Sequence, residues 1–258
     1  MLALGLVGAG AAALTAITLT SPHAAPSSPA VPRIEVRRAA DLPVVDLGWV
    51  RMRDHFLVTV GPGAGHGAAL GDLLVLADAT FAPRSGFPLH RHAGVEVVSL
   101  VVDGTLSHEE PGQTVALAAG SAQAIVAGAG IVHAEANRSE RPVRMVQVWF
   151  ASLTPGAAPT YQQLPPPAVA GLAARTFDGL RPDVQVRDGS LAPGRTEAWT
   201  IARGRIGYVL CAGGQVTLDD TQLADGDGAA LTAGWFTITA GDAPARVIVL
   251  ELPAPPDR

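Results

Sequence analysis

The sequence predicts an all-β chain built from two similar units, each a barrel or a sandwich. Short apolar runs alternate with turns rich in Gly, Pro and Asp from Ile34 onward, and the chain has 29 Gly and 21 Pro in 258 residues. Strands fit this texture better than helices do, since Gly and Pro interrupt helices. A second series of runs then echoes the first, which suggests two copies of one β unit.

The first unit is expected over residues 34–152. Its strands are predicted where short apolar runs occur, namely "GDLLVLADATF", "VEVVSLVVDGTLSHE", "QTVALAAGSAQAIVAGAGIVHAE" and "RMVQVWF". The glycines at 86, 104, 120, 128 and 130 are assigned to turns, where they supply conformations that other residues avoid. Closely spaced strands of this kind are typical of barrels and sandwiches.

A proline-rich connection is expected over 153–172, and the second unit over 173–258. In the second unit, "AGGQVTLDDTQLADGDGAAL" repeats the style of "VDGTLSHEEPGQTVALAAGSAQAI". All seven histidines precede residue 134; they are His23, His55, His66, His90, His92, His108 and His133. A metal site made of imidazoles is therefore possible only in the first unit. We expect the second unit to bind no metal and to cover one face of the first.

Residues 1–33 form an apolar extension followed by a Pro/Ser/Ala linker. Residues 2–19 carry no charge and resemble the apolar part of a secretory signal, but no basic segment precedes them. A membrane anchor, or a wrongly assigned start near Ile34, are the alternatives. The protein is exported or anchored in the first two cases and cytoplasmic in the third. Any membrane contact is expected only through residues 2–19.

The composition excludes several functions. All 18 basic residues are arginine, so lysine Schiff-base chemistry and a P-loop lysine are absent. The arginines are scattered and the net charge is −5, which argues against a nucleic-acid partner. The single cysteine, Cys211, excludes an intramolecular disulfide and a cysteine-rich metal site.

Two histidines one residue apart raise the possibility of a metal site. His90 and His92 lie in "GFPLHRHAGVE", a stretch predicted to be extended. Residues i and i+2 of a strand project from the same face, so both imidazoles can reach one ligand. Taken alone, the pair is also compatible with two ordinary surface histidines.

A second pair strengthens the metal interpretation. His133 and Glu135, in "AGAGIVHAEAN", have the same spacing about forty residues later. Two such pairs on separate strands of a barrel can converge, giving three imidazoles and one carboxylate. This set suits one divalent first-row metal with open positions for substrate; Fe(II) fits the ligand types, and Mn, Co, Ni and Cu stay open. Glu96, with the strand parity of His92, is an alternative fourth ligand or a group that orients a histidine.

The two histidine motifs resemble those of the pirin-like bicupins. The similarity extends over residues 34–253 and includes further segments, namely "IEVRRAADLPVVDLGWV", "VVDGTLSHEE", "MVQVWF…PTYQQ", "RDGSLA" and "LADGDGAAL". The resemblance implies two tandem cupin barrels of jelly-roll type. It also implies that His90, His92, His133 and Glu135 are the metal ligands, and that Glu96 lies behind them.

The sequence departs from the family pattern beside the ligands. Arg91 stands where the family usually has proline, Ala93 where a basic residue is usual, and Ala134 where serine is usual. None of the three is a ligand type. We expect Arg91 and Ala93 to alter the mouth of the pocket.

The resemblance also implies an activity. Similar bicupins are associated with quercetin 2,3-dioxygenase activity, in which a flavonol and dioxygen react at the metal. Glu135, or failing that Glu96, is then the acceptor of the proton from the substrate hydroxyl. The alternatives are a metal-binding regulatory or protein-interaction module without catalysis, and a storage cupin with an idle site. The sequence leaves the oligomeric state open.

Three other polar residues are given structural roles. His108, in "LSHEEPGQ", is expected to be a solvated residue at a hairpin, with a position at the pocket rim as the alternative. His55 is expected in the core or at the rim and not as a ligand. Asn137 is expected to bond backbone groups at a bend.

Overall fold

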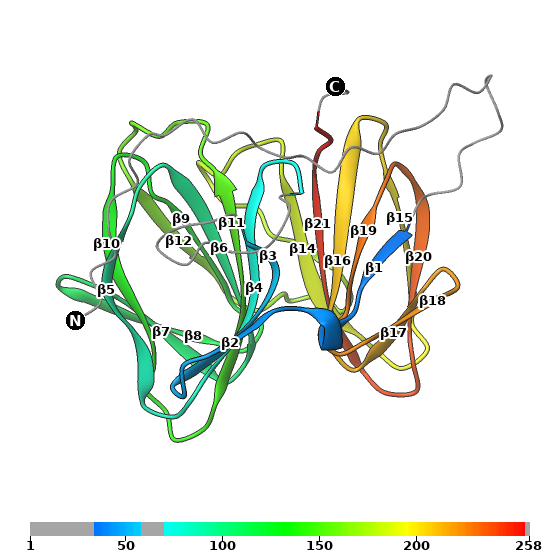
Figure 1. The fold of residues 1–258 in the computed structure, drawn as a ribbon, viewed down its shortest axis with the longest axis horizontal. Helices are drawn as coiled ribbons and strands as arrows, with labels where there is room; N and C mark the ends of the chain where they lie inside the picture. Colours follow the sequence, from blue (N-terminus) through cyan, green and yellow to red (C-terminus); the bar gives the residue numbers. More distant parts are fainter. Residues whose placement is uncertain (1–33, 58–69, 256–258) are drawn as a thin grey trace.

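The computed structural model describes residues 34–57 and 70–255, which form four antiparallel sheets (Figure 1). The predicted apolar segment 1–33 lies outside these ranges, as do His23 and His66. No helix within the described ranges has the length and apolar character needed to cross a bilayer. The all-β prediction is confirmed.

The first barrel combines a seven-stranded and a four-stranded sheet. In spatial order, the large sheet comprises β12 (Thr160–Leu164), β9 (Ala122–Val126), β6 (Val95–Asp103), β11 (Val143–Ala151), β4 (Leu73–Phe81), β3 (Val50–Leu57) and β2 (Val44–Asp46). The small sheet comprises β5 (Ser85–His92), β10 (Ile131–Asn137), β7 (Thr105–Glu110) and β8 (Gln113–Ala118). The predicted first unit is thus a two-sheet barrel.

The second barrel repeats this plan with a six-stranded and a four-stranded sheet. The large sheet comprises β1 (Ile34–Arg37), β19 (Gly228–Leu231), β16 (Arg205–Gly213), β21 (Ala245–Pro253), β14 (Gln185–Leu191) and β13 (Ala173–Ala174). The small sheet comprises β15 (Thr196–Ile201), β20 (Gly234–Ala240), β17 (Gln215–Leu218) and β18 (Thr221–Ala224). A single 3-10 turn, η1 (Ala39–Asp41), follows β1 in the described chain.

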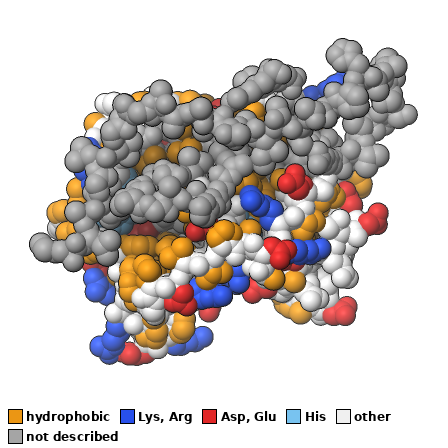
Figure 2. All heavy atoms as spheres, in the orientation of Figure 1, with side chains coloured by type: hydrophobic (Ala, Val, Ile, Leu, Met, Phe, Trp, Pro, Cys, Tyr) orange, Lys and Arg blue, Asp and Glu red, His pale blue; other side chains and the backbone are white. Residues whose placement is uncertain are grey.

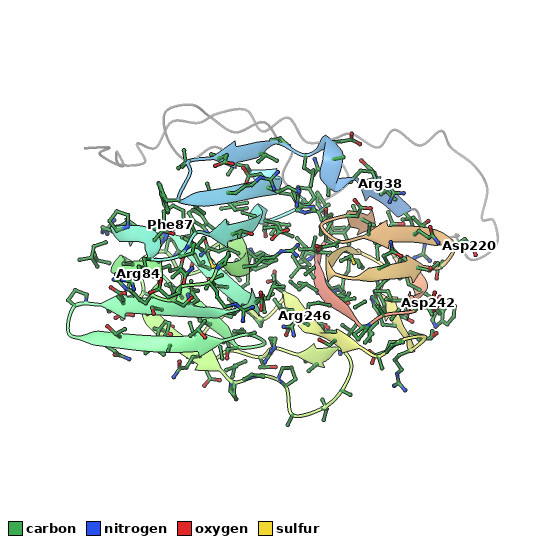
Figure 3. All side chains as sticks on the ribbon, turned by 90° about the horizontal axis from the view of Figure 1, so that it is seen from below. Arg38, Arg84, Phe87, Asp220, Asp242 and Arg246 are labelled. Atoms are coloured by element: carbon green, nitrogen blue, oxygen red, sulfur yellow. The ribbon has the colours of Figure 1, made fainter. Side chains whose placement is uncertain are left out.

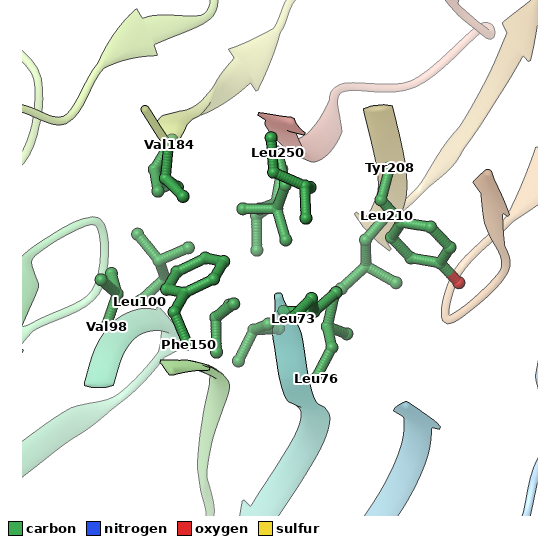
Figure 4. Packing of buried hydrophobic residues seen from close by; sticks show 14 of the residues in the cluster. Leu73, Leu76, Val98, Leu100, Phe150, Val184, Tyr208, Leu210 and Leu250 are labelled. Atoms are coloured by element: carbon green, nitrogen blue, oxygen red, sulfur yellow. The ribbon is translucent and has the colours of Figure 1, made fainter. Parts of the chain in front are cut away.

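The large sheets of the two barrels pack against each other (Figures 1 and 4). Strand β6 shows how the sequence permits this: Val98 and Leu100 face the partner sheet, while Ser99 faces the interior of the first barrel. Because both faces of this strand are covered, its sequence is an almost continuous apolar run. The shared cluster includes Phe150 from the first barrel and Leu250 from the second. The second barrel therefore covers one face of the first, as expected.

Strand β1 departs from the division at residue 34. It pairs with β19, Ile34 opposite Leu231, and so completes the large sheet of the second barrel. Arg38, seen beside that barrel in Figure 3, donates to the Asp227 carboxylate at 2.7 Å. Residues 34–37 thus belong structurally to the second barrel, although they precede the first barrel in the chain.

Charged side chains of both signs are interspersed over the described part of the face in Figure 2. Basic side chains do not form a continuous stripe on that part of the face. This agrees with the distribution of arginines along the sequence.

Candidate metal centre

The three predicted histidines come together at the junction of β5 and β10. These strands are antiparallel neighbours, with His133 directly opposite His90 and Ile131 opposite His92. One nitrogen from each of His90, His92 and His133 lies within 4.8 Å of the others. His92 and His133 are buried, whereas His90 is partly exposed. The cluster is therefore reachable from solvent on the His90 side.

A glycine allows the two strands to approach closely. Gly86 lies in β5 opposite Ala136, and a Cβ at this position would lie 2.5 Å from the Ala136 Cα. Gly86 was expected in a turn; the structure places it within a strand, where the absence of a side chain permits close contact. By contrast, Gly104, Gly120 and Gly128 have positive φ angles, as expected for turn glycines.

The hydrogen bonds around the histidines leave lone pairs available for a cation. The Nδ1 of His90 lies 2.8 Å from the Pro88 carbonyl oxygen, so this nitrogen is the donor and Nε2 has a free lone pair. That Nε2 is 3.0 Å from the Nε2 of His92. Both ring nitrogens of His133 are buried without a partner in the described structure. A bound cation would satisfy one of these two nitrogens, since a metal ion ligates only one nitrogen of an imidazole.

Both buried imidazoles are held in the neutral form that binds metals. Burial, followed by the nearby His90, lowers the pKa of His92 to about 4. Burial, followed by His90, His92 and His108, lowers the pKa of His133 to about 2. Metal–imidazole bonds of about 2.1 Å place ligand nitrogens about 3.0–3.4 Å apart. The 3.0 Å separation of the His90 and His92 nitrogens lies in this range, and the other separations are at most 4.8 Å, so the residues present fit a divalent metal.

Glu135, predicted as the fourth ligand, has a different set of neighbours. It is not among the residues whose ligand atoms lie within 4.8 Å of one another. Its carboxylate accepts hydrogen bonds from Gln123 at 2.7 Å, Gln147 at 2.8 Å and Ser99 at 3.1 Å. Two of these bonds converge on Oε1, which leaves one acceptor position on Oε2.

The three donors form one row across the opposite sheet. Gln147 on β11 is directly paired with Ser99 on β6, which is directly paired with Gln123 on β9. Glu135 extends from β10 on the small sheet and meets this row inside the barrel. These residues were not among the predicted site residues, although a glutamine inside "MVQVWF" and "SAQAIV" is a polar residue on an otherwise apolar strand.

Two aromatic residues connect the glutamines to the histidines. Trp149 donates to Gln147 at 2.8 Å, and its ring lies edge-on to His92 with centroids 4.8 Å apart. The Tyr161 hydroxyl donates to Gln123 at 3.3 Å. Burial, followed by the charges of Glu110 and Glu135, raises the pKa of Tyr161, which keeps this hydroxyl a donor.

The expectation that His108 is solvated is wrong. Its side chain is 1% exposed, it stacks on Tyr161 with centroids 4.1 Å apart, and its ring centroid is 5.1 Å from that of His133. The reason is strand parity: His108 lies on β7 opposite Glu135 and points into the barrel, before the hairpin turn begins. Its Nε2 contacts Glu110 at 3.0 Å.

Glu96 does not orient a histidine through any hydrogen bond in the described structure. Its carboxylate accepts from the Ser152 hydroxyl at 3.1 Å and from the Arg181 backbone N–H at 2.7 Å. It therefore anchors the segment that leads into the second barrel. The predicted strand parity with His92 is wrong, because β5 ends at His92 and Glu96 lies on β6, in the other sheet of the barrel.

The remaining predicted positions have structural roles. Asn137 donates to the Arg141 carbonyl at 2.7 Å, and its side-chain oxygen accepts from the Ser139 N–H, as expected of a residue at a bend. The His55 Nδ1 contacts the Tyr208 hydroxyl at 2.6 Å between the barrels. The Arg91 guanidinium donates to the Ala129 carbonyl, so this side chain covers the loop before β10.

Comparison with protein families agrees with this architecture. Residues 35–150 match the Pirin family, and residues 179–252 match the quercetinase C-terminal cupin domain. A pirin-like protein of Caulobacter vibrioides is 31% identical over 220 residues, covering 79% of this chain and 93% of the relative. A quercetin 2,3-dioxygenase of Escherichia coli is 27% identical over 190 residues, covering 70% of this chain and 82% of the relative.

Solved structures share the fold. The bacterial pirin YhhW from Escherichia coli, solved in complex with nickel(II), superposes with a TM-score of 0.77 at 24% identity, covering 86% of this chain and 100% of that one. The predicted pair of cupin barrels is thus confirmed by the family matches and by the similarity to the solved structure. This chain belongs to the pirin family of two-domain cupins.

Proposed function

We propose that this chain is a metal-dependent dioxygenase that opens flavonols such as quercetin. The observation that carries the proposal is the convergence of His90, His92 and His133, with unpartnered nitrogens on His133. Similarity to a quercetin 2,3-dioxygenase of Escherichia coli supplies the substrate class.

The proposed ligands are His90, His92, His133 and Glu135. A divalent metal held by these residues, which we propose to be Fe(II), would supply Lewis acidity that stabilises negative charge on a flavonol oxygen. Three neutral imidazoles and one carboxylate leave the site with a net positive charge, which favours an anionic substrate. In the overall reaction both atoms of dioxygen enter the product, and one ring carbon leaves as carbon monoxide.

The protein contributes a proton acceptor beside the histidines. Oε2 of Glu135 has one acceptor position free, because Gln147 is its only donor in the described structure. In the proposed mechanism this one position serves one role at a time: Oε2 ligates the metal before substrate binds, and it leaves the metal when it takes the proton of the substrate 3-hydroxyl. Gln123 and Ser99 hold the other oxygen and fix the orientation of the carboxylate.

The aromatic residues give this site one apolar side. Trp149 lies edge-on to His92, and Tyr161 stacks on His108. A planar aromatic substrate stacks favourably against such rings. These contacts support a flavonol better than a small aliphatic acid.

The test is turnover by protein purified without oxygen and loaded separately with Fe(II), Mn(II), Co(II), Ni(II) or Cu(II). We expect flavonol-dependent uptake of dioxygen, with Fe(II) the most active metal, and a decrease of at least about 100-fold in Glu135→Gln. The amide keeps the size of Glu135 but cannot accept the proton.

Glu109→Gln is the matched control. Glu109 lies on β7, forms an ion pair with Arg138 at the surface and faces away from the histidines. This variant should keep wild-type activity. If no metal-loaded form takes up dioxygen with any flavonol, the dioxygenase proposal fails, and metal-binding regulation becomes the better description.

A further inference from the structure

A second polar site lies on the outer face of the first barrel, away from the histidines. Arg51 on β3, Thr80 on β4 and Arg144 on β11 are directly paired across three adjacent strands. Arg53 and Asp78 form the next pair along β3 and β4. Because alternate residues of a strand share a face, these side chains all project to the same side of the sheet.

The second barrel closes this site. Asp225, in the turn between β18 and β19, completes the lining of a cavity of about 240 Å³. The turn continues into Gly226, which has a φ of +83°. A Cβ at Gly226 would lie 2.9 Å from Nη1 of Arg53, so the glycine leaves room for the guanidinium. The site is therefore built from both barrels.

The two carboxylates in the cavity are engaged by a single arginine. Arg144 binds both oxygens of Asp78, at 2.8 and 2.7 Å, and also contacts Asp225 at 2.9 Å. Burial alone would lower the pKa of Arg144, but the hydrogen bonds and charges of Asp78 and Asp225 together outweigh it and raise this pKa. Asp78 is 3% exposed at its side chain, so its charge is directed to Arg144 and away from solvent.

The other two arginines have unused capacity. Among the described residues, the Arg51 side chain takes part in no hydrogen bond or ion pair, and Arg53 makes only a long contact of 3.7 Å with Asp78. The Nε of Arg53 is buried without a partner. Two guanidinium groups and the Thr80 hydroxyl thus line one cavity, and the guanidinium groups have N–H donors without an acceptor among the described residues.

We infer that this cavity between the barrels binds a small phosphate-type oxyanion. Three arginines and two aspartates line it, which leaves one positive charge in excess. Arg51 and Arg53 direct several N–H donors into the same space, which matches the oxygens of a tetrahedral oxyanion better than those of a single carboxylate. Arginine forks bind tetrahedral oxyanions through paired N–H donors. The inference is independent of the proposed dioxygenase activity.

The test is calorimetric titration of the metal-loaded protein with inorganic phosphate at low ionic strength and pH 7.5. We expect one saturable site per chain in the wild type. The affinity for phosphate should fall by at least about tenfold in Arg51→Gln and in Arg53→Gln. Arg203→Gln is the matched control, since it removes the same charge from an exposed turn remote from the cavity. It should bind phosphate as the wild type does.

Three results would overturn the inference. The first is the absence of saturable binding to the wild type, which needs no variant to interpret. The second is equal weakening in all three variants, which would reflect net charge alone. The third is acetate binding as tightly as phosphate, which would contradict recognition of a tetrahedral oxyanion. Circular dichroism of each variant checks that the two barrels remain folded.

Discussion

The interiors of the two barrels differ although the barrels share a fold. In the first barrel, one row across the large sheet reads Gln147, Ser99 and Gln123, and it holds a buried carboxylate. In the second barrel, a row across β21, β16 and β19 consists of Val249, Val209 and Ala229 within an apolar core. The same strand geometry therefore supports a polar network in one case and close apolar packing in the other.

This difference shows that the chemistry resides in side chains placed on a common framework. A buried polar network stabilises a fold only when its members are fully paired, whereas apolar packing contributes through burial itself. We therefore expect substitutions in the first barrel to change metal binding and activity most strongly. Equivalent substitutions in the second barrel should change stability.

The largest effect is expected for the double variant His90→Ala/His133→Ala. It removes two of the three clustered imidazoles, and the second barrel has no histidine to replace them. Elemental analysis of the purified protein should show metal content falling at least about tenfold, from one ion per chain. His55→Gln, which alters a histidine between the barrels, should retain the metal. Unchanged metal content in the double variant would disprove the site.

The next largest effect is expected in the second barrel. Phe236 is fully buried among apolar residues of that core. Replacement by alanine should lower the free energy of unfolding by about 3–5 kcal/mol, because it removes contacts and leaves a cavity. Urea unfolding measures this, while the metal content of the folded variant should be unchanged. A loss below 1 kcal/mol would show that the second core is loosely packed.

A smaller effect is expected for Gln123→Leu in the first barrel. The substitution removes the donor at 2.7 Å from Glu135 and leaves a buried oxygen less well satisfied. The cost should be about 1–3 kcal/mol in urea unfolding. Gln113→Leu, at an exposed position on β8, is the matched control and should cost less than about 0.5 kcal/mol. Equal costs would mean that the polar row does not stabilise the barrel.

The smallest effect concerns acidification at the contact between the barrels. Burial, followed by Arg37, Arg53 and Arg144 and opposed by Asp227, lowers the pKa of His55 to about 3. The unfolded chain takes up this proton below its ordinary pKa of 6.5 while the folded protein does not, so stability is retained above pH 6.5 and is lost as the pH falls toward 3.

Between pH 7.5 and 5.5, His55 should therefore account for about 1.4 kcal/mol of lost stability. Urea unfolding of metal-loaded wild type and His55→Gln at both pH values measures the difference. The variant should lose less stability on acidification. Equal losses would mean that His55 is protonated as easily in the folded protein as in the unfolded chain.

Local patterns predicted the parts of the molecule that depend on strand parity. Spacing of two residues correctly indicated that His90 and His92 share a face, and the absence of later histidines correctly restricted the cluster to the first barrel. Apolar runs of strand length predicted the two barrels. These features depend on residues close together in the chain.

The features that sequence analysis missed depend on distant partners. Glu96 binds the backbone of Arg181, 85 positions away, and Tyr161 covers His108 from another sheet. Nothing in the neighbourhood of Glu96 or His108 specifies these contacts. Glu135 was predicted only in part. Its spacing from His133 correctly indicated that it points into the barrel, but its hydrogen-bond partners, Ser99 and Gln123, lie on distant strands.

Strand β1 has a consequence for the order in which the protein assembles. A ribosome delivers residues 34–37 before any other described part of the chain, yet their hydrogen-bonding partners, residues 228–231, emerge nearly last. Strand β1 therefore cannot form its observed pairing until the whole first barrel and most of the second have been synthesised. Once paired, β1 links the beginning of the described chain to the second barrel, so the first barrel is joined to the second at both of its chain ends.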